Sequence, residues 1–306
     1  MSSMDQDQIF TLPDIYNITV EKFGDPVHFV PIGDIHYGSP KCDRDRFLDT
    51  LKMLQEPELS KNQYIVFMGD ETDFASATDR GIISNPKSHS ATLSQLDADA
   101  LRVNKELMQH LLPFKNRILG MVQGNHYWEF LTSLPKEDIV KGMSSTAWLC
   151  RSLGTRFLGY LAYMRIIIHY LNTTQCLSVD IVVCHGKAGG KLIGASINQV
   201  NDLRSVFPGA DVYVFGHDHQ RYAVPVSDLS VTRNAKDPLK LLLKQKRKYL
   251  VRSGSFERGY VPEEGGYVMG KLLRPAELGI VVLKLEADRV RKDGVSTTFL
   301  DIHAWS

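Results

Sequence analysis

The chain has 306 residues, of which 43% are hydrophobic and 23% are charged. This composition is typical of an ordinary globular protein, and it excludes overall disorder. The formal net charge of +1 predicts no global attraction to nucleic acid or to a membrane surface. We expect one domain over residues 1–306, with its motifs in residues 27–226 and a basic segment and further strands in residues 240–306, because α/β folds often run to about 250 residues or more as one unit.

In chain order, the first predicted elements are a strand at Val27–Ile32, a helix at Asp45–Gln55, a strand at Tyr64–Met68, a helix at Ser94–Leu112, a strand at Arg117–Gln123 and a helix at Pro135–Leu153. Strands are then expected at Ser178–Cys184, Asp211–Phe215, Arg221–Val226, Lys248–Ser253, Gly279–Leu285 and Thr297–His303. This alternation of apolar runs with amphipathic stretches predicts a layered α/β fold, with strands enough for a second sheet. The least regular segments are candidate substrate-gating loops: Phe74–Thr92, Asn234–Pro238 and Pro262–Pro275.

The cysteines and the apolar segments indicate where the protein resides. No C-x-x-C pair occurs, which predicts free thiols in a reducing compartment. The four cysteines are Cys42, Cys150, Cys176 and Cys184. The first residues hold no basic and apolar leader, and the most apolar stretch, 161–171, is broken by Arg165 and His169. We therefore expect a cytoplasmic protein with no membrane association.

A short polar block follows each of five predicted strands. The blocks are Gly33-Asp34-Ile35-His36, Gly69-Asp70, Gly124-Asn125-His126, His185-Gly186 and Gly216-His217-Asp218-His219. Because sites in open α/β sheets form where loops leave the carboxyl ends of strands, we expect the five blocks to converge on one edge of the core. Carboxylate, imidazole and amide groups gathered in this way can hold two divalent ions about 3.5–4 Å apart, the geometry used for attack on phosphorus.

Spacing within the blocks suggests how the ions would be shared. Asp34 and His36 are two residues apart, as are His217 and His219, so on extended backbone each pair would point the same way. Asp70 has two carboxylate oxygens and can bridge two ions. Each block alone is also compatible with an ordinary turn, and it is the conjunction of five that indicates a metal site. A ligand set without thiolate favours Mn²⁺, with Fe or Zn as alternatives.

The ordered motifs D-x-H, G-D-x-x-D, G-N-H, H-G and G-H-x-H resemble the signature of the calcineurin-like metallophosphoesterase superfamily, from Gly33 to His219. The resemblance implies a sandwich of two mixed β-sheets flanked by helices. It also implies one ion held by Asp34, His36, Asp70 and His219, and a second ion held by Asp70, Asn125, His185 and His217.

By the same resemblance, a hydroxide that bridges the two ions attacks phosphorus, and His126 protonates the leaving oxygen. Asp73 is the residue expected to orient His126 and to raise its pKa. Many relatives place an acidic residue directly after the Asn-His pair, whereas Tyr127 and Trp128 stand before Glu129 here. The sequence therefore leaves open which residue assists His126.

The substrate is suggested by cations and aromatic residues beside the blocks. Lys187 and Lys191 follow His185 and could hold a nucleic-acid backbone. Tyr127 and Trp128 could stack on a base, or could equally belong to the core. A second basic run is interpreted first as a solvated helix face and second as a nucleic-acid site: Lys240, Lys244, Lys246, Arg247 and Lys248.

The leading hypothesis is a two-metal phosphodiesterase acting on a phosphodiester substrate, foremost as a nuclease and next as a nucleotide phosphodiesterase. Diesters need less charge neutralisation than monoesters, and the Arg-Gly that follows G-D-x-x-D in Ser/Thr protein phosphatases is Phe74-Ala75 here. A phosphomonoesterase or protein phosphatase is the alternative. A non-catalytic scaffold is the third, disfavoured because every expected ligand is present. The segment Gly254–Tyr260 also resembles phosphoesterases encoded by phages and prophages.

Overall fold

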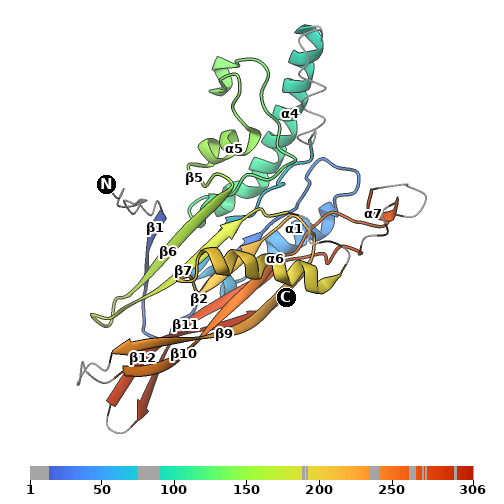
Figure 1. Ribbon diagram of the computed structural model, residues 1–306. Coiled ribbons are helices and arrows are strands. Elements are labelled where there is room, and N and C mark those ends of the chain that lie inside the picture. The colour runs from blue at the N-terminus through green and yellow to red at the C-terminus, as the bar shows by residue number, and fades with distance from the viewer. Residues whose placement is uncertain are drawn as a thin grey trace, which may run out of the picture.

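Two six-stranded β-sheets pack against each other, and helices cover their outer faces (Figure 1). The computed structural model describes residues 14–74, 90–187, 190, 192–233, 241–261, 267–270, 272, 274–292 and 295–305. Among these residues, no helix is both long and apolar enough to cross a membrane. All four cysteines are free thiols.

The first sheet has the strand order β1-β6-β7-β8-β10-β9. Its strands are β1 Asp14–Val20, β6 Leu161–Tyr170, β7 Cys176–Cys184, β8 Val212–Phe215, β9 Arg221–Arg233 and β10 Leu241–Ser253. Neighbours β7, β8 and β10 run parallel, whereas β6 is antiparallel to β7 and β9 to β10.

The second sheet has the order β12-β11-β2-β3-β4-β5. Its strands are β2 Val27–Ile32, β3 Gln63–Phe67, β4 Ile118–Met121, β5 Arg156–Phe157, β11 Val282–Lys292 and β12 Val295–Trp305. Strands β2 to β5 are parallel, and β11 is antiparallel to both β2 and β12. The predicted sandwich of two mixed sheets is therefore confirmed.

Side chains alternate between two cores along the central strands, as the period of two in a strand requires. Val66 and Met68 point into the core between the two sheets, whereas Ile65 and Phe67 point into the core beneath the helices. A strand buried on both faces has no polar side and reads as a continuous apolar run. This is why the motif-bearing strands were visible in the sequence, each to within two residues of its observed bounds.

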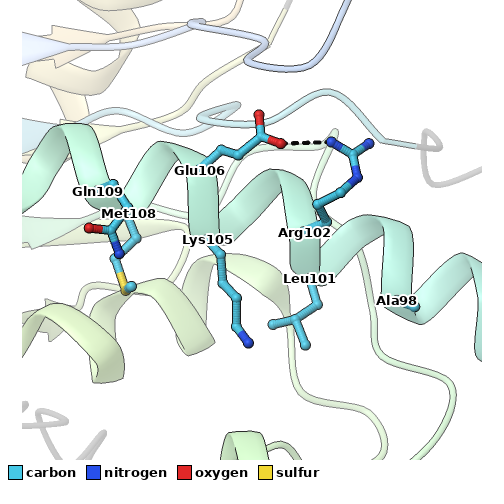
Figure 2. A pocket seen from close by; sticks show the side chains of 7 residues that line it. All are labelled: Ala98, Leu101, Arg102, Lys105, Glu106, Met108 and Gln109. Carbon is cyan, nitrogen blue, oxygen red and sulfur yellow. Dashed lines mark hydrogen bonds and ion pairs between the residues drawn. The ribbon is translucent and has the colours of Figure 1, made fainter.

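The helices are α1 Arg44–Met53, α2 Pro57–Ser60, α4 Ser90–Leu111, α5 Ser145–Leu153, α6 Ile193–Val206 and α7 Tyr267–Gly270, with 3₁₀ turns at Leu112–Phe114 and Pro135–Glu137. Helices α1, α4 and α5 pack on the second sheet, and α6 packs on the first. One end of α4 extends beyond the sandwich (Figure 1). Along α4, seven side chains line an open hollow that contains an Arg102–Glu106 ion pair of 2.7 Å (Figure 2).

The helix predicted at Pro135–Leu153 is wrong over its first half. Only Ser145–Leu153 is α-helical, and its start is set by Ser144, whose side chain accepts a hydrogen bond from the amide of Ala147. Upstream, Asp138 has a φ of 57° and Gly142 a φ of 86°. Left-handed residues cannot continue a right-handed helix, so apolar periodicity alone was misleading here.

The basic run is also corrected. Residues 241–248 belong to β10 and pair with β9, so they form no helix face, while Lys240 lies outside the described residues. Lys246 forms an ion pair with Asp211 at 2.5 Å, and the buried Lys248 forms one with Asp228 at 3.0 Å. These two cations thus neutralise carboxylates of the protein itself. The expected gating loops fall largely outside the described residues, at 75–89, 234–238, 262–266, 271 and 273.

Candidate metal centre

The five polar blocks lie at the carboxyl ends of β2, β3, β4, β7 and β8, two of which belong to the first sheet and three to the second. Hydrogen bonds join the blocks across the sandwich. The His185 ring contacts the carbonyl of Met68 through Nδ1 at 2.8 Å. The amide of His217 donates to both carboxylate oxygens of Asp34, at 3.0 and 2.9 Å. The blocks therefore converge at one end of both sheets.

Three groups of candidate ligands form there, each with its ligand atoms within 4.8 Å of one another. Two consist of predicted ligands: Asp34, His36 and His219, and Asp70, His185 and His217. The third joins His36 to Asp73 and His126. Asp70 lies between the first two groups, because its Oδ2 is 3.2 Å from His185 Nε2 and 3.8 Å from His36 Nε2. Asn125 Oδ1 lies 2.9 Å from His185 Nε2, on the side of the second group. All seven side chains selected from the sequence are thus brought together.

The backbone at these residues is left-handed, so the expectation of extended segments is wrong. Five of the seven have positive φ angles: Asp34 51°, His36 50°, Asp70 53°, His217 71° and His219 56°. Such a conformation costs about 1–3 kcal/mol for a residue with a side chain and is concentrated at functional sites. Tight turns directly after the strands, and not a shared strand face, aim the side chains at a common point.

Glycines in the blocks allow the turns to touch. A Cβ atom at Gly124 would lie 2.0 Å from Asp70 Oδ1, and one at Gly69 would lie 2.6 Å from His185 Nδ1. Both distances are far below van der Waals contact. A side chain at either position would therefore displace the carboxylate or the imidazole from the centre.

A buried Asp218–Arg252 pair, which no sequence motif indicated, holds the last block in place. Arg252 is fully buried and donates to the carbonyl of Gly216 at 2.5 Å, and its Nη2 lies 3.3 Å from Asp218 Oδ2. Ser196, on α6, also donates to Asp218. Because Asp218 separates His217 from His219, this network fixes the direction of both imidazoles.

Burial of acidic groups makes the centre suited to cations. Asp34 is 0% exposed and Asp70 is 3% exposed. Burial raises the pKa of Asp34 to about 7, helped by the nearby charge of Asp70 and opposed by His185 and His36. Burial also acts to raise the pKa of Asp70, but the charges of His185 and His36 outweigh it and lower that pKa. Divalent cations would remove the cost of burying two carboxylates together.

The electrostatics divide the ligand imidazoles into two pairs, because burial favours the neutral form of His217 and His219, whereas nearby carboxylates raise the pKa of His36 and His185. Burial and the charge of His185 lower the pKa of His217 to about 4, and burial lowers the pKa of His219 well below its usual value, which keeps both rings neutral as metal ligands must be. Burial opposes charge on His36, yet Asp73 and the other carboxylates raise its pKa to about 10. The Nε2 atom of His36 is buried without a hydrogen-bond partner. A metal ion is a partner that this atom can take.

His126 stands beside the ligands in a different setting. Its amide donates to Asp70 Oδ1 at 2.8 Å, and its Nδ1 lies 2.9 Å from Asp73 Oδ1. The close contact with the Asp73 carboxylate raises the pKa of His126, against burial. The same Asp73 oxygen lies 3.2 Å from His36 Nδ1, so one carboxylate contacts both rings. With 31% of its side chain exposed, His126 is more accessible than the ligand imidazoles His36 and His185.

The residues expected to contact substrate differ in their exposure in the structure. Lys187 is exposed next to His185, and Lys191 lies outside the described residues. Tyr127 is half-buried. Of the two alternatives left open for Trp128, base stacking or the core, the structure shows the core, because its side chain is buried and its indole N–H donates to Asp97 at 2.8 Å.

Two acidic residues at the centre were missed. Glu71 is buried, and its carboxylate accepts hydrogen bonds from the amide of Gly69 and the hydroxyl of Thr146, each at 3.2 Å. Glu257 lies close to His36 and His219. Glu71 adjoins a motif residue and could have been suspected from its position. No signal within the five motifs points to Glu257, and the segment Gly254–Tyr260 that contains it was noted in the sequence only for a resemblance to other phosphoesterases.

The model of the calcineurin-like phosphoesterase family matches residues 27–221. The chain therefore belongs to the calcineurin-like phosphoesterase family, whose members are metal-dependent phosphoester hydrolases, and the resemblance carried by the five motifs is confirmed. The matched region contains every block of the candidate centre.

Two solved structures are similar to this one at a distance. A conserved uncharacterized protein from Streptococcus pneumoniae, described as a predicted phosphoesterase, is 12% identical, with 90% of this chain and 98% of that chain covered and a TM-score of 0.33. Vacuolar Protein Sorting 29 from Cryptosporidium parvum is 12% identical, with 93% and 100% covered and a TM-score of 0.37. A comparison with curated proteins gave no significant match.

Proposed function

We propose that this protein is a dinuclear metal-dependent phosphodiesterase. The observation that supports this function is the arrangement of two ligand groups on either side of Asp70, with the His126–Asp73 pair next to them. Two ions bridged by a carboxylate, together with an adjacent imidazole acid, are the parts needed for hydrolysis of a phosphate ester.

Each ion would be held by residues from both sheets. The first would be held by Asp34, His36, Asp70 and His219, and the second by Asp70, Asn125, His185 and His217. Oxygen and imidazole ligands without thiolate favour Mn²⁺, with Fe or Zn as alternatives. When bound, two such ions activate water and neutralise the charge that develops at phosphorus.

The chain's own groups would complete the reaction. Because His126 Nδ1 faces Asp73, the opposite nitrogen, Nε2, would carry the proton that passes to the leaving oxygen. Asp73 would set the tautomer of His126 and hold the ring in position. The contact of Asp73 with His36 would couple the orientation of the acid to that of a metal ligand.

The charges around the centre favour a diester over a monoester. Within the part of the chain that the structure describes, the ion-pair partners of the site side chains are His, Asp or Glu, with no Arg or Lys among them. A doubly charged monoester needs more neutralisation than a singly charged diester. The exposed Lys187 beside His185 could contact the backbone of a nucleic acid, so a nuclease is the first form of the activity to test.

The test is hydrolysis of bis(p-nitrophenyl) phosphate by Mn²⁺-loaded protein, with p-nitrophenyl phosphate in parallel and a chelator-treated control. Chelator-sensitive turnover that favours the diester is the expected result. Single- and double-stranded DNA, RNA and cyclic nucleotides then define the substrate. Preference for the monoester would show a phosphomonoesterase, and no turnover with two ions bound would contradict the assigned reaction.

A further inference from the structure

The segment after β10 lies against the metal centre, although it is outside the five motifs. Strand β10 ends at Ser253, and the next residues run past the turn that contains Asp34. The amide of Phe256 donates to the carbonyl of Asp34 at 2.9 Å, and the hydroxyl of Ser255 donates to the same carbonyl at 3.0 Å. The carbonyl of Phe256 also accepts from the amide of Asp43 at 2.7 Å. This segment is therefore fixed to the first ligand turn.

Glu257 is the residue that these contacts present to the centre. Its own amide donates to Ser255 Oγ at 2.9 Å, which holds the backbone in place. Its Oε2 atom lies 3.8 Å from His36 Nε2 and 3.6 Å from His219 Nδ1. Only 19% of the side chain is exposed. A carboxylate thus lies beside His36 Nε2 and His219 Nδ1, while Asp34 Oδ1 lies 3.6 Å from the other ring nitrogen of His219, Nε2.

The distances fit a shared ion better than hydrogen bonds. At 3.6 and 3.8 Å, the Glu257 oxygen is too far from either ring for a hydrogen bond. Atoms bound to one ion at about 2.0–2.2 Å lie roughly 3–4 Å apart. His36 Nε2 is buried and has no hydrogen-bond partner, although Asp70 Oδ2 also lies 3.8 Å away. An ion among these atoms would satisfy the nitrogen and both carboxylates.

We propose that Glu257 is an additional carboxylate ligand of the ion held by Asp34, His36 and His219. This inference rests on the proposed two-metal function and extends its ligand set beyond the motifs. A further carboxylate lowers the net positive charge of the centre by one unit. It therefore favours an oxygen-preferring ion such as Mn²⁺ at this position, and it favours a singly charged diester over a doubly charged monoester.

The test is Mn²⁺ binding to Glu257→Gln, which removes the charge and keeps the shape. Isothermal titration of the metal-free protein, with the electron paramagnetic resonance signal of free Mn²⁺ as a second measure, gives the number and affinity of sites. We expect the affinity of one site to fall by roughly 10–100-fold or more, and that of the other to stay near the wild-type value. Far-UV circular dichroism confirms that the variant is folded.

The matched control is Glu286→Gln, which makes the same change of charge on β11. Glu286 forms an ion pair with Lys284 at 2.7 Å. It follows Leu285, which pairs with Val27 at the start of β2, so Glu286 lies at the strand end opposite the centre. This variant should bind Mn²⁺ as the wild type does. Glu257→Asp keeps the charge but shortens the side chain, and it should lose less affinity than Glu257→Gln.

The outcomes separate this inference from the proposed function. If the wild type binds two Mn²⁺ ions and Glu257→Gln binds both with unchanged affinity, Glu257 is not a ligand and the two-metal function stands. An equal loss in the Glu286→Gln control would also overturn the assignment. If the wild type binds no Mn²⁺, the proposed function and the inference both fail.

Discussion

His126→Ala should remove acid catalysis while leaving the metal ions bound. The ring contacts Asp73 through Nδ1 at 2.9 Å and is 31% exposed, whereas the ligand rings of His36 and His185 are 2% and 5% exposed. Its loss therefore leaves the packed ligand groups intact. A positioned general acid contributes about 10²–10⁴-fold to a rate, which corresponds to roughly 3–5 kcal/mol of transition-state stabilisation.

The size of the loss should depend on the leaving group. An alkoxide needs a proton as its bond to phosphorus breaks, whereas p-nitrophenolate is stable as an anion. We expect kcat/KM to fall by about 10²–10⁴-fold on a dinucleotide and by less than about tenfold on bis(p-nitrophenyl) phosphate. The assay compares both substrates at saturating Mn²⁺, with metal content measured by mass spectrometry on the same preparations.

His169→Ala is the matched control. His169 lies on β6, where its Nε2 contacts Asn17 Oδ1 at 3.0 Å on the surface. This variant should keep both the turnover and the metal content of the wild type. Equal losses on the two substrates in His126→Ala would refute the acid role. Loss of metal would show instead that His126 is a ligand.

Three further variants test other parts of the structure. Asp70→Asn should lose metal and activity together, because this carboxylate lies between the two ligand groups, near both His185 and His36. A variant with both ions retained would contradict the bridging role. Asp43→Ala should lower stability by about 1 kcal/mol at neutral pH, because Asp43 caps α1. Burial acts against ionisation of Asp43, but hydrogen bonds led by the one from Arg258 lower its pKa. The stabilisation by Asp43 is therefore present above about pH 4 and is lost as the pH falls through the pKa of the folded state. Below that pH, the difference in melting temperature between Asp43→Ala and the wild type should shrink. Trp128→Phe should lower the free energy of unfolding by about 1–3 kcal/mol, because it removes the hydrogen bond to Asp97, and should leave turnover nearly unchanged. A selective rise in KM for nucleic acid would instead support the stacking hypothesis.

The motif-bearing strands could be predicted because each contains consecutive buried residues close to its motif. All six residues of β2 are buried, so Val27–Ile32 is a continuous apolar run that stops at Gly33. Strand β6 was missed because it alternates between buried and more exposed positions, which places Arg165 and His169 on its open side. Helix α6 was missed for a local reason. It begins after Leu192, which provides no side-chain cap, and its sequence therefore carries no start signal.

The types of the site residues could be predicted, but their backbone conformation could not. D-x-H and G-H-x-H specify chemistry and order, whereas the left-handed φ angles of Asp34 and His217 depend on contacts between turns from different sheets. The amide of His217 donates to the Asp34 carboxylate, and these residues are 183 positions apart. No window of sequence contains both partners, so the extended backbone was the natural expectation from local spacing.

The same limit explains why Glu257 escaped notice and why its placement carries weight. The hydroxyl of Ser255 reaches the carbonyl of Asp34 across 221 positions of sequence, so only the fold brings this segment to the centre. A glutamate on a polar loop is ordinarily solvated, because burial of an unpaired carboxylate is costly. Here the loop is held by hydrogen bonds on both sides of Glu257, and Arg258 forms an ion pair with Asp43 at 3.1 Å. A backbone fixed this firmly, with a carboxylate 3.8 Å from the buried and unpartnered Nε2 of His36, is best explained by an ion that both groups bind.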